Sequence, residues 1–191
     1  MTARTAAIAR RLVRGVLSLA AVLHLTACGV DSDDLYATYS AYFRYTAVST
    51  TPPLLSALTS PGMFCAISFS NSVYNFRGCD GATYTYTPTA VDAQITREYI
   101  NGFIVGTPAV QDLTGSSLVA YDLVCPNCYV DSYIQRSLTF ATTSTVQCGR
   151  CQRTYDLNNS GIVISDEGGT SLFRYHITYA ATGTGVLIIQ N

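Results

Sequence analysis

Apolar and polar side chains alternate with a period of two along much of the chain, and this pattern predicts β-strands. It is clear in residues 82–89 (ATYTYTPT) and 96–106 (TREYINGFIVG), where Asn101-Gly102 is placed as a type I′ hairpin turn. Two further strands at 171–179 (SLFRYHITY) and 186–190 (VLIIQ) are expected to form a terminal β-hairpin. The pattern therefore predicts an all-β domain.

One segment departs from this alternation. Thr51-Pro52-Pro53 is followed by LLSALTS and then by Pro61-Gly62, which predicts one short helix with a proline at its start and a proline-glycine stop. Residues 35–48 indicate a linker that enters a strand. The residues after Cys128 (YVDSYIQRSLTF) are alternating and β-branched, and they are expected to be extended.

The amino terminus has the pattern of an export signal. Four arginines within the first 14 residues precede an apolar run at 15–25 that is too short for a permanent membrane helix. The run ends in Leu25-Thr26-Ala27-Cys28-Gly29, which resembles the lipobox of bacterial lipoproteins. We expect a signal peptide at 1–27, a lipid on Cys28, a tether at 28–40 and a domain at 41–191; the alternative is an ordinary signal peptide with an incidental cysteine.

Composition narrows the functions that are possible. The chain has no lysine, so all 11 basic residues are arginines and a Schiff-base lysine mechanism is excluded. After loss of residues 1–27, 7 arginines face 12 acidic residues, which argues against a nucleic-acid partner. Residues 29–34 (GVDSDD) resemble the acidic export tag of surface lipoproteins from gut Bacteroidetes, although a solvated spacer would have the same composition. An outer-membrane lipoprotein, periplasmic or surface-exposed, is the expected location.

Four cysteines have the spacing of a metal site. Cys125 and Cys128 form one C-x2-C pair, and Cys148 and Cys151 form a second pair after 19 intervening residues. Each pair can direct two thiolates at one point, and two pairs complete a tetrahedron. Outside the cytoplasm, two disulfides are the alternative. Tyr129 and Gln152 stand where zinc knuckles often have a glycine with positive φ.

The other two cysteines of the expected domain, Cys65 and Cys79, flank a segment that alternates like two short strands. We expect a disulfide between them, whose loop of about 15 residues would stabilise the fold by about 3 kcal/mol. Cys125-Pro126-Asn127-Cys128 after a strand also suggests a thiol-disulfide oxidoreductase. That alternative requires a helix beginning at the motif and a βαβ pattern, and neither is predicted here.

Candidate catalytic groups are few. His176 is the one histidine of the expected mature chain, and it lies in a strand without a nucleophile motif nearby. Asp166 and Glu167 stand beside two glycines and have the pattern of a solvated turn. No G-x-S-x-G, phosphate loop or H-E-x-x-H is present in the sequence. A non-enzymatic role is favoured.

From Ala120 to Asn191 the order is strand, C-P-N-C loop, strand, C-G-R-C loop, glycine and closing hairpin. This order resembles the Rieske iron-sulfur domain, and most closely a Rieske-like group of lipoproteins from gut Bacteroidetes. The resemblance implies an antiparallel β-sandwich or barrel with a four-cysteine subdomain at about 122–157. Both cluster histidines are replaced by cysteine, namely Cys128 and Cys151.

This replacement changes the expected chemistry. All-cysteine ligation places a [2Fe-2S] cluster near about −400 mV, whereas two histidines raise the potential to roughly −150 to +300 mV. Four thiolates at this spacing suit one tetrahedral ion, and Zn²⁺ is favoured because it needs no redox partner. The leading hypothesis is a lipid-anchored envelope protein with a structural metal and a binding or assembly role toward an unknown envelope protein or ligand. An electron carrier with rubredoxin-type iron or [2Fe-2S] is the alternative.

Overall fold

A computed structural model describes residues 35–70, 72–110, 117–165 and 168–191. Within these ranges the named strands form two sheets, and every pairing among them is antiparallel. The larger sheet has the order β1-β12-β11-β6-β5-β2-β3-β4. Its strands are β1 (Tyr42–Tyr45), β2 (Met63–Ser70), β3 (Val73–Gly78), β4 (Thr83–Tyr86), β5 (Phe103–Thr107), β6 (Val119–Asp122), β11 (Arg174–Ala180) and β12 (Val186–Gln190). The prediction of an all-β fold is confirmed.

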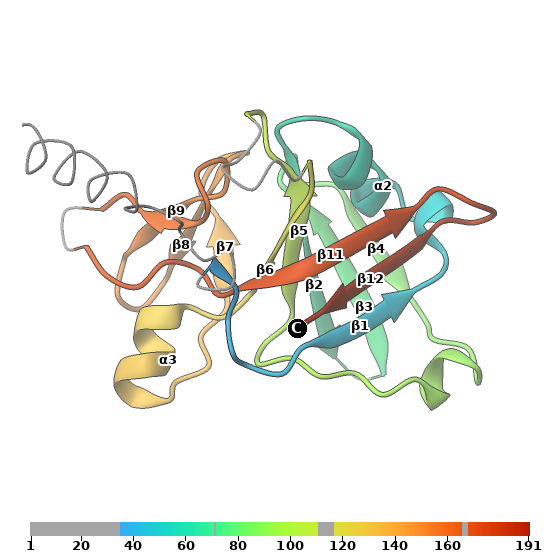
Figure 1. The fold of residues 1–191 in the computed structure, drawn as a ribbon, viewed down its shortest axis with the longest axis horizontal. Coiled ribbons are helices and arrows are strands. Elements are labelled where there is room, and N and C mark those ends of the chain that lie inside the picture. The colour runs from blue at the N-terminus through green and yellow to red at the C-terminus, as the bar shows by residue number, and fades with distance from the viewer. Residues whose placement is uncertain (1–34, 71, 111–116, 166–167) are drawn as a thin grey trace, which may run out of the picture. The chain divides into compact units, whose positions relative to one another are not determined.

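The large sheet curls into a half-barrel around an aromatic core (Figure 1). The Tyr45 ring on β1 lies 5.0 Å from the Phe76 ring on β3 and 5.1 Å from the Tyr86 ring on β4, so an edge strand faces the strands at the other end of the sheet. Helix α2 (Pro52–Thr59) follows the 3-10 turn η3 (Val48–Thr50) and packs Leu54 and Leu58 into this core. The helix predicted from the proline entry is confirmed.

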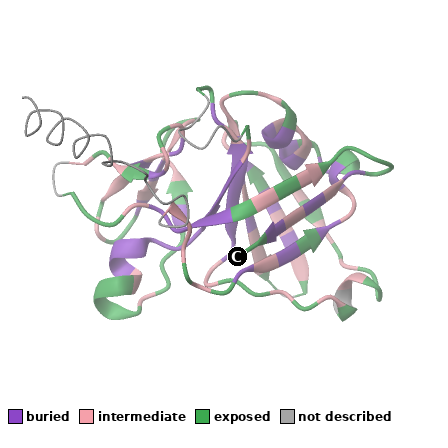
Figure 2. Ribbon diagram, in the orientation of Figure 1, coloured by how far each residue is buried: buried purple, intermediate pink, exposed green. Residues whose placement is uncertain are grey.

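The central strands of the large sheet are buried on both faces (Figure 2). Along β5, Phe103 and Val105 point into the half-barrel, whereas Ile104 belongs to a second core on the outer face. A strand covered on both sides has no need for polar alternation, which explains the continuous apolar run FIVG. The outer core is what positions the smaller sheet.

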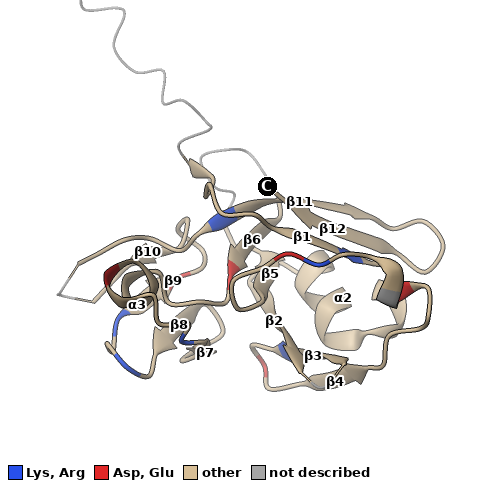
Figure 3. Cartoon of the chain, turned by 90° about the horizontal axis from the view of Figure 1, so that it is seen from below, with Lys and Arg blue, Asp and Glu red and all other residues tan. Residues whose placement is uncertain are grey.

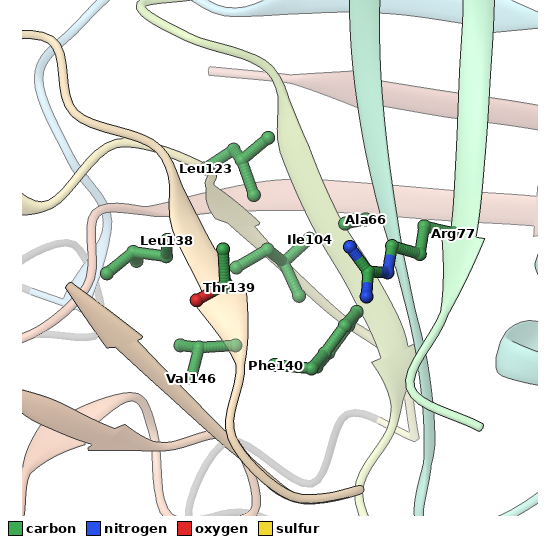
Figure 4. A pocket seen from close by; sticks show the side chains of 8 residues that line it. All are labelled: Ala66, Arg77, Ile104, Leu123, Leu138, Thr139, Phe140 and Val146. Carbon is green, nitrogen blue, oxygen red and sulfur yellow. The ribbon is translucent and has the colours of Figure 1, made fainter. Parts of the chain in front are cut away.

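The smaller sheet packs against that outer face. Its order is β10-β9-β8-β7, and its strands are β7 (Leu138–Phe140), β8 (Thr145–Cys148), β9 (Thr154–Asp156) and β10 (Ile162–Val163). Leu138, Val146 and Tyr155 from this sheet join Ile104 in one buried cluster. Where the two sheets meet, a pocket of about 40 Å³ remains, lined by Ala66, Arg77, Ile104, Leu123, Leu138, Thr139, Phe140 and Val146 (Figure 4). It has room for little more than a few water molecules.

Two local predictions are wrong. A second helix, α3 (Pro126–Ser132), occupies residues that were expected to be extended, so the described chain has two α-helices rather than one. Asn101-Gly102 is not the turn of a hairpin, because the segments before and after it do not pair with each other. β5, after the turn, pairs with β2 and β6, whereas Glu98, before it, bridges Tyr42. The short 3-10 turn η4 (Asp92–Gln94) lies earlier in the same connection. Gly102 has φ +120°, and a Cβ there would collide with the Ile67 carbonyl, so the glycine serves a close backbone approach.

Candidate metal centre

Four cysteine sulfurs converge at the junction of the two sheets. The Sγ atoms of Cys125, Cys128, Cys148 and Cys151 all lie within 4.8 Å of one another. Two of the separations run between the loops: 3.6 Å from Cys125 to Cys151 and 3.7 Å from Cys128 to Cys148. The first three cysteines are buried, and Cys151 is half-buried. The sequence prediction that these four residues come together is therefore met by the geometry.

The first pair is presented by the start of α3. Cys125 is the N-cap, and Pro126 at the first helical position has a φ suited to a helix and no N–H to satisfy. The Cys125 amide donates to the Arg136 carbonyl at 2.8 Å, and the Tyr129 amide donates to the Cys125 carbonyl at 3.0 Å. One helical turn thus brings Cys128 back beside Cys125. Tyr133 ends the helix in the left-handed conformation, with φ +53°.

The second pair is presented by a tight turn after β8. The Arg150 amide donates to Cys148 Sγ at 3.4 Å, and the Gln152 amide donates to the Cys148 carbonyl at 3.0 Å. Gln152 has φ +59°. Zinc knuckles often have a glycine with positive φ at this position, directly after the second cysteine. Here a glutamine adopts the same backbone conformation. Tyr129, the corresponding residue of the first loop, is helical and needs no such conformation.

The two loops meet by a route that the sequence did not indicate. The strands before the loops, β6 and β8, are not direct neighbours, because they belong to different sheets. β7 joins them: the Leu138 amide donates to the Leu123 carbonyl at 2.9 Å, and β7 pairs with β8. The end of the large sheet and the small sheet are therefore continuous at the cysteine cluster.

Tyr155 and Asn127 form a polar layer behind the first pair. The Tyr155 hydroxyl lies 3.2 Å from Cys125 Sγ and accepts a hydrogen bond from Asn127 Nδ2 at 2.9 Å, which leaves its own hydrogen for the sulfur. The Asn127 side chain also forms two hydrogen bonds with the backbone of Thr170. It donates to the Thr170 carbonyl and accepts from the Thr170 amide, each at 3.0 Å. Sequence reasoning missed both residues, because nothing local marks them as neighbours of the cysteines.

Protonation of the thiols depends on their surroundings. Burial raises the pKa of Cys125 and of Cys128, since a thiolate there loses its hydration. At Cys151 burial also acts to raise the pKa, but hydrogen bonds from Arg153 and from the neighbouring cysteines lower it to about 7. Four thiolates so close together require a cation, and a bound metal would displace the remaining protons.

The separations fit metal ligation better than disulfides. A disulfide holds its sulfurs at about 2.0 Å. A tetrahedron with a Zn–S bond of about 2.3 Å has edges of about 3.8 Å. The cross-loop separations of 3.6 and 3.7 Å lie close to the second value, and none of the four cysteines forms a disulfide. The cluster can hold a metal ion.

The predicted disulfide between Cys65 and Cys79 is absent, because both residues are free thiols. The reason is the register of β2 and β3. Cys65 pairs with Gly78, and the Cys79 amide donates to the Phe64 carbonyl at 2.9 Å, so Cys79 lies opposite Phe64. Cys65 therefore faces the inner core, whereas Cys79 faces the outer one. Alternation along a strand places the two thiols on opposite faces of the sheet.

The remaining candidate residues fall into two groups. His176 lies in β11, as the sequence predicts, and it is exposed and stacks on the Tyr36 ring at 3.7 Å. Asp166, Glu167 and Cys28 lie outside the described residues, as does the predicted signal peptide. Within the described residues no helix is both long enough and apolar enough to cross a bilayer.

One buried acid was not singled out by the sequence. Asp122, at the end of β6, is fully buried and accepts hydrogen bonds from the Val124 amide at 2.8 Å, the Ile100 amide at 3.2 Å and the Tyr175 hydroxyl at 3.2 Å. Burial raises the pKa of its carboxyl to about 6, although these bonds act to lower it. Asp122 thereby fixes the backbone that leads into Cys125.

Comparison of the chain with protein-family models and with curated protein sequences finds no match.

Proposed function

We propose that the four cysteines hold one Zn²⁺ ion, which fastens the small sheet to the end of the large one. The observation that carries this is the convergence of two thiol pairs, one at the start of α3 beyond the large sheet and one at the end of β8 in the small sheet, with cross-loop separations of 3.6 and 3.7 Å. Zn²⁺ takes four thiolates in a tetrahedron and needs no electron donor or acceptor. A closed site of four protein ligands leaves no position for substrate, which favours a structural role.

The shortness of the small sheet supports a need for such a cross-link. Its strands β7 and β9 have three residues each, and β10 has two. Ladders of this length stabilise a sheet weakly. Where ligands converge only in the folded state, the free energy of metal binding becomes free energy of folding.

For the whole protein, the proposed function is non-enzymatic binding or assembly in the cell envelope, with a lipid on Cys28 as the anchor to the outer membrane. The basic residues, the apolar run and the lipobox-like residues at 25–29 support the anchor. The expected partner is an envelope protein or ligand.

The Rieske-like assignment is retained as a proposal on the basis of the two cysteine loops and the closing hairpin of β11 and β12. Iron at the same cysteines is the competing proposal. Amide-to-sulfur bonds such as that from Arg150 to Cys148 serve iron as well as zinc, and they favour an electron carrier if iron is found. Iron gives visible charge-transfer absorption, whereas zinc leaves the protein colourless.

Removal of one thiol tests the structural role. Cys148→Ser is expected to lower the melting temperature by about 10 °C or more, since the lost binding energy is several kcal/mol and 1 kcal/mol corresponds to about 2–4 °C at this size. Cys79→Ser is the matched control, because Cys79 is a half-buried thiol outside the cluster. Equal melting temperatures for the two variants would contradict a structural metal.

The anchor is tested by cell fractionation. Wild-type protein is expected in the membrane fraction with a lipid label, and Cys28→Ser is expected to lose both. Retention of the Cys28→Ser variant in the membrane, together with an unlabelled wild type, would contradict the lipoprotein proposal.

A further inference from the structure

The outer face of α3 carries an aromatic surface that the metal centre does not use. We call it the α3 patch, and it consists of Tyr39, Tyr129, Val130, Tyr133 and Phe173. The Tyr39 ring lies 5.5 Å from the Tyr129 ring and 4.7 Å from the Phe173 ring, and the Tyr129 ring lies 6.0 Å from the Tyr133 ring. Three segments far apart in sequence thus contribute to one surface.

The patch is open to solvent at its outer side. Tyr133 is 82% exposed and Val130 is 48% exposed, whereas Phe173 forms the buried base. Tyr133 also has φ +53°, a conformation that is uncommon for a bulky residue. The backbone at this helix end would be served as well by glycine or asparagine. Packing within the chain therefore does not explain the ring at this position.

The patch lies where the described chain begins. Tyr39 is the fifth described residue and belongs to the patch. Three residues before it, Tyr36 stacks on His176. Leu35 lies seven positions after Cys28, and at about 3.5 Å per position the chain between them reaches at most about 25 Å. A lipid on Cys28 would hold this side of the domain close to the membrane.

The chemistry of the patch matches the membrane interface. Tyrosine combines an apolar ring with a hydroxyl that stays hydrated, and it is enriched at the headgroup level. The charges near the patch do not strongly attract or repel the membrane surface. Asp131 in α3 and Arg136 just after it are both exposed, and their formal charges cancel (Figure 3). The patch by itself would bind the membrane only weakly. Its effect would be to orient a domain that the lipid already holds at the membrane.

We propose that the α3 patch rests in the headgroup region of the membrane that carries the Cys28 lipid. This inference depends on the lipid anchor of the proposed function. Because α3 also carries Cys128, the metal centre would lie at the membrane-proximal end of the domain. The end of β5 would point away, since β5 runs antiparallel to β6 and β6 leads into α3.

The absence of tryptophan permits a direct test. Tyr133→Trp places a unique fluorophore in the patch. Val110→Trp places one beyond the end of β5, where Val110 is 70% exposed. Both variants are expressed with residues 1–27 in place, and the processed proteins are reconstituted into vesicles of phosphatidylethanolamine and phosphatidylglycerol with bromine on the upper acyl chain. Flotation with the vesicles is measured alongside the fluorescence.

The proposal predicts that both variants float with the vesicles. The emission maximum of Tyr133→Trp is expected to shift to shorter wavelength, and bromine is expected to quench most of its fluorescence. The fluorescence of Val110→Trp is expected to be unchanged. Flotation without quenching of Tyr133→Trp would overturn the inference, leave the anchor intact and favour a protein partner for the patch. Failure of both variants to float would overturn the anchor and the inference together. Equal quenching at both positions would overturn the proposed orientation.

Discussion

Tyr155 is the residue whose side chain most directly supports a cysteine of the cluster. Its hydroxyl lies 3.2 Å from Cys125 Sγ and is itself held by Asn127. Burial raises its pKa, so the hydroxyl stays protonated and remains a donor. Groups of this kind orient a metal ligand and stabilise its charge.

The corresponding prediction concerns metal affinity. Tyr155→Phe is expected to weaken metal binding about 10- to 100-fold, because a hydrogen bond to a ligand sulfur is lost while the ring remains packed. Competition with a chromophoric chelator measures the effect. Tyr84→Phe, on β4 of the large sheet, is the control and is expected to bind metal as the wild type does. Equal affinity for all three proteins would show that the hydroxyl plays no part.

Asp122 predicts a pH dependence of stability. Its folded pKa of about 6 lies above the ordinary 3.8, so the folded state holds the proton more tightly than the unfolded state. Stability from this group is therefore greatest below about pH 4 and falls as pH rises through about 6, by about 3 kcal/mol in total.

Urea unfolding of the wild type and of Asp122→Asn across this pH range measures the contribution. The variant is expected to lack this component of the slope. A carboxyl resonance of Asp122 that titrates near pH 4 would contradict the prediction directly.

At the scale of elements, α3 shows where sequence reasoning fails. Residues 129–140 alternate in a way typical of a strand, but Pro126 sets the start of a helix and the Tyr133 amide closes it on the Tyr129 carbonyl at 2.8 Å. The short helix therefore depends on tertiary contacts, such as those of Asn127 with Thr170, that no local pattern reveals. By contrast, α2 and the terminal hairpin carry their own stop signals, and both were predicted.

The geometry of the two loops predicts how the cysteines pair on oxidation. With metal removed and glutathione disulfide as the oxidant, Cys125 should bond to Cys151 and Cys128 to Cys148, because these sulfurs lie only 3.6 and 3.7 Å apart. Each bond forms with loss of two thiol protons, and its two electrons reduce one glutathione disulfide to two thiols.

Tryptic digestion under non-reducing conditions reads out the pairing. Cleavage after Arg136 and Arg150 separates Cys148 and Cys151 from the first loop and from each other. Cross-loop bonds keep the three peptides together, and fragmentation in the mass spectrometer assigns the partners. Release of the first-loop peptide with an internal Cys125–Cys128 bond would contradict the prediction.

For the molecule as a whole, local chemistry was readable from the sequence and register was not. The four-cysteine cluster was predicted because the C-x2-C spacing is itself local geometry. Cys65 and Cys79 were wrongly paired because the face on which a thiol lies depends on which residue stands opposite, here Gly78 and Phe64. The division into two sheets was also hidden, since it depends on Ile104 and its neighbours being buried on the outer face.

The central claim is that one metal ion joins the two sheets through four thiolates and that this ion is zinc. Elemental analysis of full-length protein, purified without metal-loaded resin, tests it most directly, with Cys148→Ser and Cys79→Ser measured in parallel. We predict one zinc per chain in the wild type and in Cys79→Ser, and loss of most of it in Cys148→Ser. Metal-free wild type with its four cysteines oxidised, stoichiometric iron, or zinc retained in full by Cys148→Ser would contradict the claim.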